Sequence, residues 1–215
     1  MIKGNGKALQ IGIMADSHGE PDTITSALEL LKDRGCSRFY HLGDICDSLN
    51  PDTAEACVRI LSEHGVAAVK GNNEHALVIS QEMNTELPVP AQVITFMKRL
   101  EPVIRDRYAV LAHSLPFEKE LGVSCMIRGM TREFADMFMH RFPDRILFRG
   151  HSHIPEMIWK DKKDILTRDI RVGEEINFRG GIPCLVTCGA LTRGLCMIWK
   201  PEHMTITCLS FREGE

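Results

Sequence analysis

The chain has 215 residues, of which 44% are hydrophobic and 26% are charged, and its formal net charge is -3. These values are typical of a soluble globular protein of one domain, and they argue against bulk nucleic-acid binding, which needs a basic surface. We also expect no membrane association, because no apolar stretch is long enough to span a bilayer and residues 1–10 lack the apolar core of a signal peptide.

The eight cysteines include no Cys-x-x-Cys pair. Several of them, such as Cys184 and Cys188, lie in apolar runs, where a thiol behaves as a small hydrophobic group. A disulfide framework is the alternative, but a chain of this length does not need one. We therefore expect a reducing compartment, the cytoplasm, for this protein.

The first third of the chain repeats a unit of strand, polar motif and helix. Apolar runs predict strands at 9–14, 38–42 and 66–69. Helical periodicity follows the first two strands, and Asn50 and Pro51 form a suitable cap and first position for the second helix. This order is typical of an α/β fold with a parallel sheet, in which ligands bind beyond the carboxyl ends of the strands.

The middle of the chain is more helical. We expect a helix over 90–100 and a strand over 108–112 that runs into His113. Residues 116–142 then interrupt the strand rhythm, with Thr131 as the predicted cap of a helix. This insertion forms either a helical lid over a site, where it would determine specificity, or a packed pair of surface helices.

A period of two residues dominates the chain after His153. Residues 157–160 and 165–167 form a predicted hairpin, and residues 183–187, 195–200 and 204–211 follow as further strands. We expect an antiparallel sheet that completes the fold. Because the sequence contains no linker or repeat, we predict a single domain over residues 1–215.

Polar side chains follow the predicted strands in a regular order. They are Asp16 and His18, Asp44, Asn72, His113, and finally His151 and His153. In an extended segment residues i and i+2 point to the same side, so both imidazoles of the last pair can face one spot. Each residue alone has a simpler explanation, such as a solvated strand end or a surface turn. Their repeated position after a strand favours one shared site.

This set supplies two carboxylates, one amide and four imidazoles, which are enough for two divalent ions that share a carboxylate. Nitrogen and oxygen donors without a thiolate suit manganese, iron, zinc or nickel, with manganese first, and fit calcium poorly. His41 and His64 lie outside the pattern, and we interpret them as a strand residue and a cation at a helix C-terminus.

The motifs resemble those of the calcineurin-like metallophosphoesterases, whose signature is Asp-x-His, Gly-Asp-x-x-Asp, Gly-Asn-His-Glu/Asp, a later His-Gly, and Gly-His-x-His. The resemblance covers 9–211, and the short chain is most similar to the small bacterial and archaeal branch, which includes phosphodiesterases. The corresponding segments here are Asp16-Ser17-His18, Gly43-Asp44-Ile45-Cys46-Asp47, Gly71-Asn72-Asn73-Glu74, His113-Ser114 and Gly150-His151-Ser152-His153.

The resemblance implies a four-layer α/β/β/α sandwich of two mixed sheets flanked by helices. It also implies that Asp44 bridges two ions and that Asp47 and Glu74 orient ligands or backbone groups from behind them. Two such ions clamp a phosphate and lower the pKa of a shared water, and the resulting hydroxide attacks phosphorus. The implied ligands of the first ion are Asp16, His18, Asp44 and His153, and those of the second are Asp44, Asn72, His113 and His151.

Two residues depart from the family pattern. Asn73 replaces the motif histidine, and as a catalytic residue it can donate a hydrogen bond but cannot act as an acid near neutral pH. The loss of that acid matters least for esters with acidic leaving groups. Members of the small branch also lack this histidine and lean towards diester substrates, so the resemblance implies a preference for phosphodiesters. His75 could substitute, but two residues further on it is expected to point elsewhere. Ser114 replaces the usual glycine after His113. Its side chain leaves less room for other groups to approach the backbone at this position.

Four arginines are candidates for phosphate contact, although a solvated or ion-paired side chain is the simpler interpretation of each. They are Arg128, Arg132, Arg149 and Arg193. The predicted function is therefore a binuclear metal-dependent hydrolase of a small phosphoester, and the chain could form a homo-oligomer. Two alternatives remain: a phosphomonoesterase acting on nucleotides or small phosphorylated metabolites, and a protein-interaction scaffold with a residual metal site.

Overall fold

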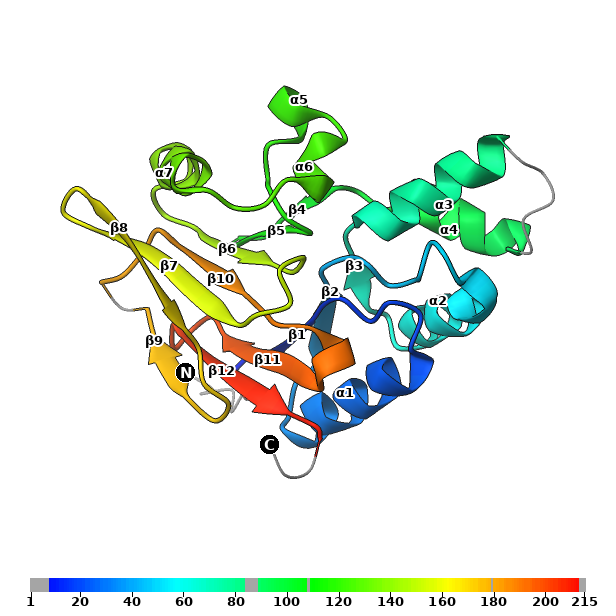
Figure 1. Cartoon of the computed structure of the whole chain (residues 1–215). Helices are drawn as coiled ribbons and strands as arrows, with labels where there is room; N and C mark the ends of the chain where they lie inside the picture. Colours follow the sequence, from blue (N-terminus) through cyan, green and yellow to red (C-terminus); the bar gives the residue numbers. More distant parts are fainter. Residues whose placement is uncertain (1–7, 84–88, 108, 179, 213–215) are drawn as a thin grey trace, which may run out of the picture.

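The computed structural model describes residues 8–83, 89–107, 109–178 and 180–212. Two mixed sheets of six strands each face one another, and helices cover their outer faces (Figure 1). The predicted four-layer α/β/β/α sandwich is therefore confirmed. Residues 1–7, part of the polar N-terminal segment, and Tyr108, predicted to begin a strand, lie outside the described residues.

The first sheet contains the three strands predicted in the first third of the chain. β1 runs parallel to β2, and β2 runs parallel to β3, so their carboxyl ends lie at one edge of the sheet. The remaining strands continue the sheet in antiparallel pairs. In spatial order the strands are β3 (Ala67–Ala68), β2 (Arg38–His41), β1 (Ile11–Met14), β11 (Leu195–Lys200), β12 (Thr205–Ser210) and β9 (Glu175–Asn177).

The second sheet has three parallel strands at its centre. β6 pairs in parallel with β5 and with β10, and the predicted hairpin is β7 and β8, in which Trp159 pairs with Leu166. In spatial order the strands are β4 (Val103–Arg105), β5 (Ala109–Ala112), β6 (Ile146–Arg149), β10 (Cys184–Thr187), β7 (Glu156–Asp161) and β8 (Asp164–Asp169).

The expectation of one antiparallel sheet after His153 is wrong. β7, β8 and β10 extend the second sheet, whereas β9, β11 and β12 extend the first, and β10 is parallel to β6. A period of two reports that one face of a strand is buried, but it does not report which neighbour the strand pairs with. β4 and β9 were not predicted as separate strands, since three residues are too few to show a period.

Helices α1 (Pro21–Asp33), α2 (Ala54–Glu63), α3 (Asn72–Met83) and α4 (Ala91–Arg99) lie on the side of the first sheet. α1 buries Ile24, Ala27, Leu28 and Leu31 in a core cluster that also holds side chains of α2 and α4. A short 3-10 helix, η1 (Pro51–Thr53), precedes α2. Asn50 stands before it as predicted, but its side chain makes no capping hydrogen bond.

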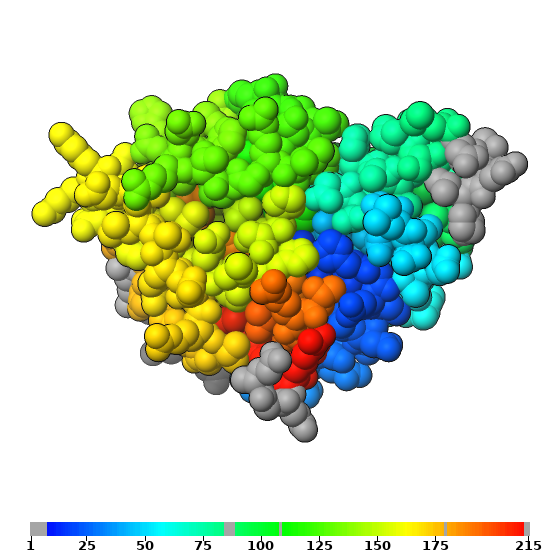
Figure 2. All heavy atoms as spheres, in the orientation of Figure 1, coloured from blue at the N-terminus to red at the C-terminus, as the bar shows by residue number. Residues whose placement is uncertain are grey.

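Helices α5 (Glu118–Leu121), α6 (Ser124–Ile127) and α7 (Arg132–Arg141) form the insertion on the side of the second sheet. The Thr131 side chain accepts a hydrogen bond from the Phe134 N–H and caps α7, as predicted. α7 buries Ala135, Phe138 and Met139 against the second sheet, so it supplies the fourth layer of the sandwich. In Figure 2 this green segment covers the surface next to residues near position 150.

The core between the two sheets is apolar. Phe148 of β6 and Trp199 of β11 are fully buried there, with ring centroids 5.0 Å apart. All eight cysteines are buried and unpaired, as the apolar runs around them suggested. No helix among the described residues has the length and apolar character that a membrane crossing requires.

Replacement of Trp199 should loosen the contact between the sheets. We expect Trp199→Ala to lower the free energy of unfolding by about 3–5 kcal/mol, because it opens a cavity in a fully buried position. Urea denaturation followed by circular dichroism measures the loss. Trp159→Ala on β7 is the control, because the Trp159 side chain is only half-buried, and it should lower the free energy of unfolding clearly less. Equal losses in the two variants would contradict the assigned role of Trp199.

Candidate metal centre

The polar motifs meet at one edge of the sandwich. Asp16 and His18 follow β1 and Asp44 follows β2, while Asn72 begins α3, the helix that follows β3. The second sheet contributes His113 after β5, together with His151 and His153 after β6. Backbone hydrogen bonds hold neighbouring loops together, from the Asp16 N–H to the Gly43 carbonyl (3.1 Å) and from the Gly150 N–H to the His113 carbonyl (3.0 Å). Both sheets thus carry donor side chains to the same place.

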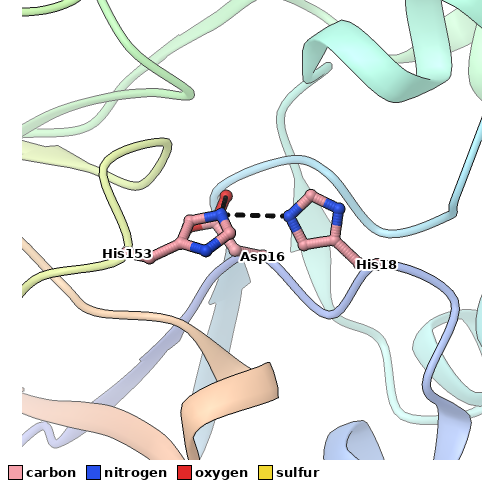
Figure 3. Close-up of side chains that lie close together, drawn as sticks. All are labelled: Asp16, His18 and His153. Carbon is pink, nitrogen blue, oxygen red and sulfur yellow. Dashed lines mark hydrogen bonds and ion pairs between the residues drawn. The ribbon is translucent and has the colours of Figure 1, made fainter.

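One group of donors contains Asp16, His18 and His153. One donor atom of each residue lies within 4.8 Å of the others. The Nε2 atoms of His18 and His153 are 3.0 Å apart, and His153 Nε2 lies 3.6 Å from Asp16 Oδ1. Figure 3 shows the two imidazoles approaching edge to edge from separate loops, with the Asp16 carboxylate beside them.

A second group is built around His113. Its Nδ1 lies 2.8 Å from the Leu42 carbonyl, so Nδ1 carries a proton and, in the neutral imidazole, the lone pair is on Nε2. That Nε2 atom lies 3.0 Å from Asn72 Oδ1 and 3.1 Å from His151 Nδ1. His113 also lies close to both carboxylates, since one donor atom each of His113, Asp16 and Asp44 lies within 4.8 Å of the others.

Asp44 connects the two groups. Its Oδ2 atom lies 3.9 Å from His18 Nε2 and 3.5 Å from His113 Nε2. All seven residues that the sequence selected as ligands therefore belong to one connected cluster of side chains. Their donors are carboxylates, an amide and imidazoles, a set that fits a divalent transition ion.

The backbone at these residues adopts an unusual conformation. Among the described residues, seven that are not glycine have positive φ, and five of the seven belong to the cluster. Such a backbone costs about 1–3 kcal/mol per residue and persists where the surrounding structure imposes it, often at functional sites. The five residues are Asp16 (57°), His18 (44°), Asp44 (53°), His151 (71°) and His153 (62°).

Two glycines permit the close approach of the loops. A Cβ atom at position 71 would overlap the backbone nitrogen and Oδ1 of Asp44, and one at position 150 would lie 2.7 Å from Asp16 Oδ2. Neither clash can be relieved by moving the end of a flexible side chain, because both carboxylates are buried. The motif glycines are therefore required by packing around Asp16 and Asp44.

Burial and mutual contact shift the protonation of these groups. Burial raises the pKa of Asp16 to about 7, against the opposing charge of His113. Burial alone would lower the pKa of His113, but its contacts with Asp44 and Asp16 raise the pKa to about 9. Burial also acts to raise the pKa of Asp44, but hydrogen bonds from His113 and Asn73 hold it below its usual range. The shifts of Asp44 and His113 thus share one cause, which is the close contact between a buried carboxylate and a buried imidazole.

Glu74 is buried behind Asp44 and acts on the backbone. Its carboxylate accepts hydrogen bonds from the N–H groups of Gly71 (2.9 Å), Asp44 (3.0 Å), Ile45 (2.8 Å) and Cys46 (3.0 Å). It therefore sets the path of the loop that carries Asp44.

Asp47, for which a similar role was expected, lies further along the same loop. Its Oδ1 atom accepts a hydrogen bond of 2.8 Å from the Leu49 N–H, a local turn contact. This bond shapes the loop beyond Asp44.

The Asn73 side chain points into the cluster and is held on both sides. Its Nδ2 donates to Asp44 Oδ2 (2.8 Å), and its Oδ1 accepts from the N–H (3.0 Å) and the hydroxyl (2.6 Å) of Ser48. His75 lies on α3 near Glu82. Lys98 is the main cause of the lowered pKa of Glu82, and His75 adds a smaller effect. At the position of the motif histidine, Asn73 thus reaches the cluster through its contact with Asp44.

The candidate arginines have different surroundings. Arg128 is exposed, and Arg132 donates to the Ile165 carbonyl (3.4 Å) on β8. Arg193 is exposed and adds to burial and His18 in lowering the pKa of His153. Arg149 is buried and bonded to protein groups, so it is not available to a substrate.

The sequence interpretation missed the role of His41. It is buried on β2, and its Nε2 lies 3.1 Å from Ser17 Oγ, which donates to the Ile45 carbonyl (2.9 Å). These hydrogen bonds connect the loop after β1 to the loop after β2. A histidine inside an otherwise apolar strand was the available signal.

Loss of the Glu74 carboxylate should disturb the loop that it organises. We expect Glu74→Gln to lower the free energy of unfolding by about 1–3 kcal/mol, because an amide NH2 would face backbone donors. Chemical denaturation of the metal-free protein measures the change. Glu63→Gln removes an exposed pair with Arg59 and should cost less than about 0.5 kcal/mol; an equally small effect at Glu74 would contradict its role.

Comparison with known proteins agrees with this geometry. The model of the calcineurin-like phosphoesterase superfamily domain matches residues 9–177. An uncharacterized protein of Methanocaldococcus jannaschii is 24% identical over 158 residues, which span 67% of this chain and 63% of that protein, less than two thirds of its length.

Solved structures show the same fold. A metallophosphoesterase from Sphaerobacter thermophilus superposes with a TM-score of 0.75 at 20% identity, covering 95% of this chain and 88% of the other. A proposed diadenosine tetraphosphatase gives a TM-score of 0.63 at 17% identity, with 98% and 96% covered. The resemblance inferred from the motifs is confirmed, and the chain belongs to the calcineurin-like phosphoesterase superfamily.

Proposed function

We propose that this member of the superfamily is a binuclear metal-dependent phosphoester hydrolase that prefers phosphodiesters. The observation that carries the proposal is the position of Asp44 Oδ2 between His18 Nε2, at 3.9 Å, and His113 Nε2, at 3.5 Å. Two bound divalent ions would supply an activated water as the nucleophile and compensate the charge on the phosphate.

The contacts support a division of the ligands between two ions. His18 and His153 meet each other, and His113 meets Asn72 and His151, so two separate groups of donors lie on either side of Asp44. One ion would take Asp16, His18, Asp44 and His153, and the other would take Asp44, Asn72, His113 and His151. Asp44 is the shared ligand in this assignment.

The donor chemistry also bears on the metal. Imidazole nitrogen and carboxylate oxygen without thiolate suit manganese, iron, zinc or nickel, and we propose manganese first. All eight cysteines are buried free thiols, which supports a reducing compartment such as the cytoplasm.

The diester preference rests on Asn73. Its amide already donates to Asp44 and accepts from Ser48, and an amide cannot release a proton to a leaving group near neutral pH. Without an acid, the reaction depends on positioning and charge stabilisation, which suffice for an ester whose leaving group is a weak base. Phosphomonoesters of aliphatic alcohols are poorer substrates for such a site.

The relative rate on two chromogenic esters tests the preference. With manganese present, we expect a higher kcat/KM for bis-p-nitrophenyl phosphate than for p-nitrophenyl phosphate. The two esters share a leaving group, so a difference between them reports the ester class and not the need for an acid. A steady-state assay of p-nitrophenol release measures both. Faster cleavage of the monoester would favour the alternative, a phosphomonoesterase.

Asp44→Asn tests the bridging role. We expect turnover to be lost, by about 100-fold or more, because the shared carboxylate supplies several kcal/mol of charge stabilisation through the ions. Circular dichroism should show an unchanged fold, since asparagine preserves the shape of the side chain. Activity near that of the unsubstituted chain would contradict the bridging role. Absence of metal binding under every loading condition would leave the scaffold alternative.

A further inference from the structure

A row of polar side chains crosses the second sheet at the edge that carries the metal centre. Ser114 follows β5, Arg149 ends β6, Thr187 ends β10 and Glu156 begins β7. In the sheet register Arg149 pairs with Ala112 and Thr187, and Thr187 pairs with Glu156. These side chains share the face that packs against α7, because Leu147, Leu185 and Ile158, each two residues away along its strand, belong to the core cluster under that helix.

Arg149 is the centre of this row. It is 1% exposed, and a buried guanidinium is tolerated only where its donors find acceptors. Its Nε donates to the Ser114 carbonyl (3.2 Å), its Nη2 donates to Ser114 Oγ (3.3 Å), and its Nη1 donates to Thr187 Oγ1 (2.9 Å). Glu156 completes the surroundings, with Oε1 3.5 Å from Nη1 and 3.2 Å from Thr187 Oγ1. The planar guanidinium is thereby locked in one orientation.

The contact between Arg149 and Ser114 lies directly beside two candidate ligands. Ser114 follows His113 in the chain, and Arg149 is two residues before His151. The backbone link from the Gly150 N–H to the His113 carbonyl runs between them. Arg149 therefore holds together the two loops whose imidazoles meet at 3.1 Å, from His113 Nε2 to His151 Nδ1.

The hydroxyl of Ser114 extends this link to the insertion. It donates to the Arg128 carbonyl at 2.6 Å, and the neighbouring Ile127 backbone carbonyl hydrogen-bonds to His151. A glycine at position 114, as in the family motif, would make neither the contact to Arg128 nor the one to Arg149 Nη2. The serine thus connects the insertion to the same pair of histidines.

We propose that Arg149, held by Ser114, Thr187 and Glu156, is a positioning residue for the half of the metal centre formed by His113 and His151. This inference rests on the proposed function, because it assumes that both histidines bind one metal ion. The other half depends less on Arg149, because His153 is held by its contacts with His18 and Asp16.

Metal titration of three variants and one control tests the proposal. Arg149→Met removes every side-chain hydrogen bond, and Arg149→Lys keeps the charge but lacks the planar guanidinium that bonds Ser114 and Thr187 together. Ser114→Gly removes the CH2OH side chain and with it the hydroxyl contacts. Arg145→Met is the matched control, since Arg145 lies at the opposite end of β6 and donates to the Asp106 carbonyl (3.0 Å). For each protein, equilibrium dialysis against manganese gives stoichiometry and affinity, and urea denaturation gives the stability of the metal-free form.

We expect Arg149→Met to weaken binding of one of two manganese ions by about 10–100-fold, as is usual when a group supporting a ligand is lost. Ser114→Gly should weaken the same ion less, Arg149→Lys should fall between the two, and Arg145→Met should bind both ions normally. Should Arg149→Met fail to fold, the comparison of Arg149→Lys and Ser114→Gly with Arg145→Met carries the test.

Normal affinity for both ions in Ser114→Gly and the Arg149 variants would overturn the proposal, even if those variants were less stable than the control. Equal weakening of both ions would also overturn it, because Arg149 would then not act on one half. An unsubstituted chain that binds no manganese would overturn the proposed function first and this inference with it.

Discussion

The geometry of the cluster depends on the buried carboxylate of Asp44. It is 3% exposed and touches both groups of histidines, so a displacement would leave a buried charge without partners, at a cost of several kcal/mol. Asn73 donates to it from its backbone and side chain, and Glu74 anchors the loop behind it. The approach is so close that residue 71 has no room for a side chain. The loops of the first sheet are thus shaped around one functional group.

The strained backbone of the cluster is maintained by the rigid sheets beneath it. Asp16, His18 and Asp44 all have positive φ, yet their loops are joined by bonds from the Asp16 N–H to the Gly43 carbonyl and from the His18 N–H to the Asp44 carbonyl. Each loop leaves a strand that is hydrogen-bonded in register to its neighbour. The packed core between the sheets offsets the local cost, which is how strain is normally tolerated at such sites.

Much of this arrangement could be predicted because its signals are local. Asp16 and Asp44 each stand directly after an apolar run, and the ends of parallel strands share an edge, so their meeting follows from order along the chain. Three features could not be predicted, because they depend on contacts distant in sequence. They are the partners of β10, the left-handed backbone at His151, and the burial of Arg149. In the sequence, Arg149 has the pattern of an exposed charged residue at the end of a strand. That the assembled residues bind two ions stays a prediction.

The two departures from the family motif have a common physical character. Asn73 and Ser114 each bring a neutral hydrogen-bonding group to the border of the cluster, and protein partners occupy both, Ser48 for the first and Arg149 with Arg128 for the second. Neither group can donate a proton as an acid, and both restrain a candidate ligand or its loop. A site built in this way depends on fixed charges and orientation rather than on proton delivery. Under the proposed function, its substrates would carry leaving groups that depart without protonation by the enzyme.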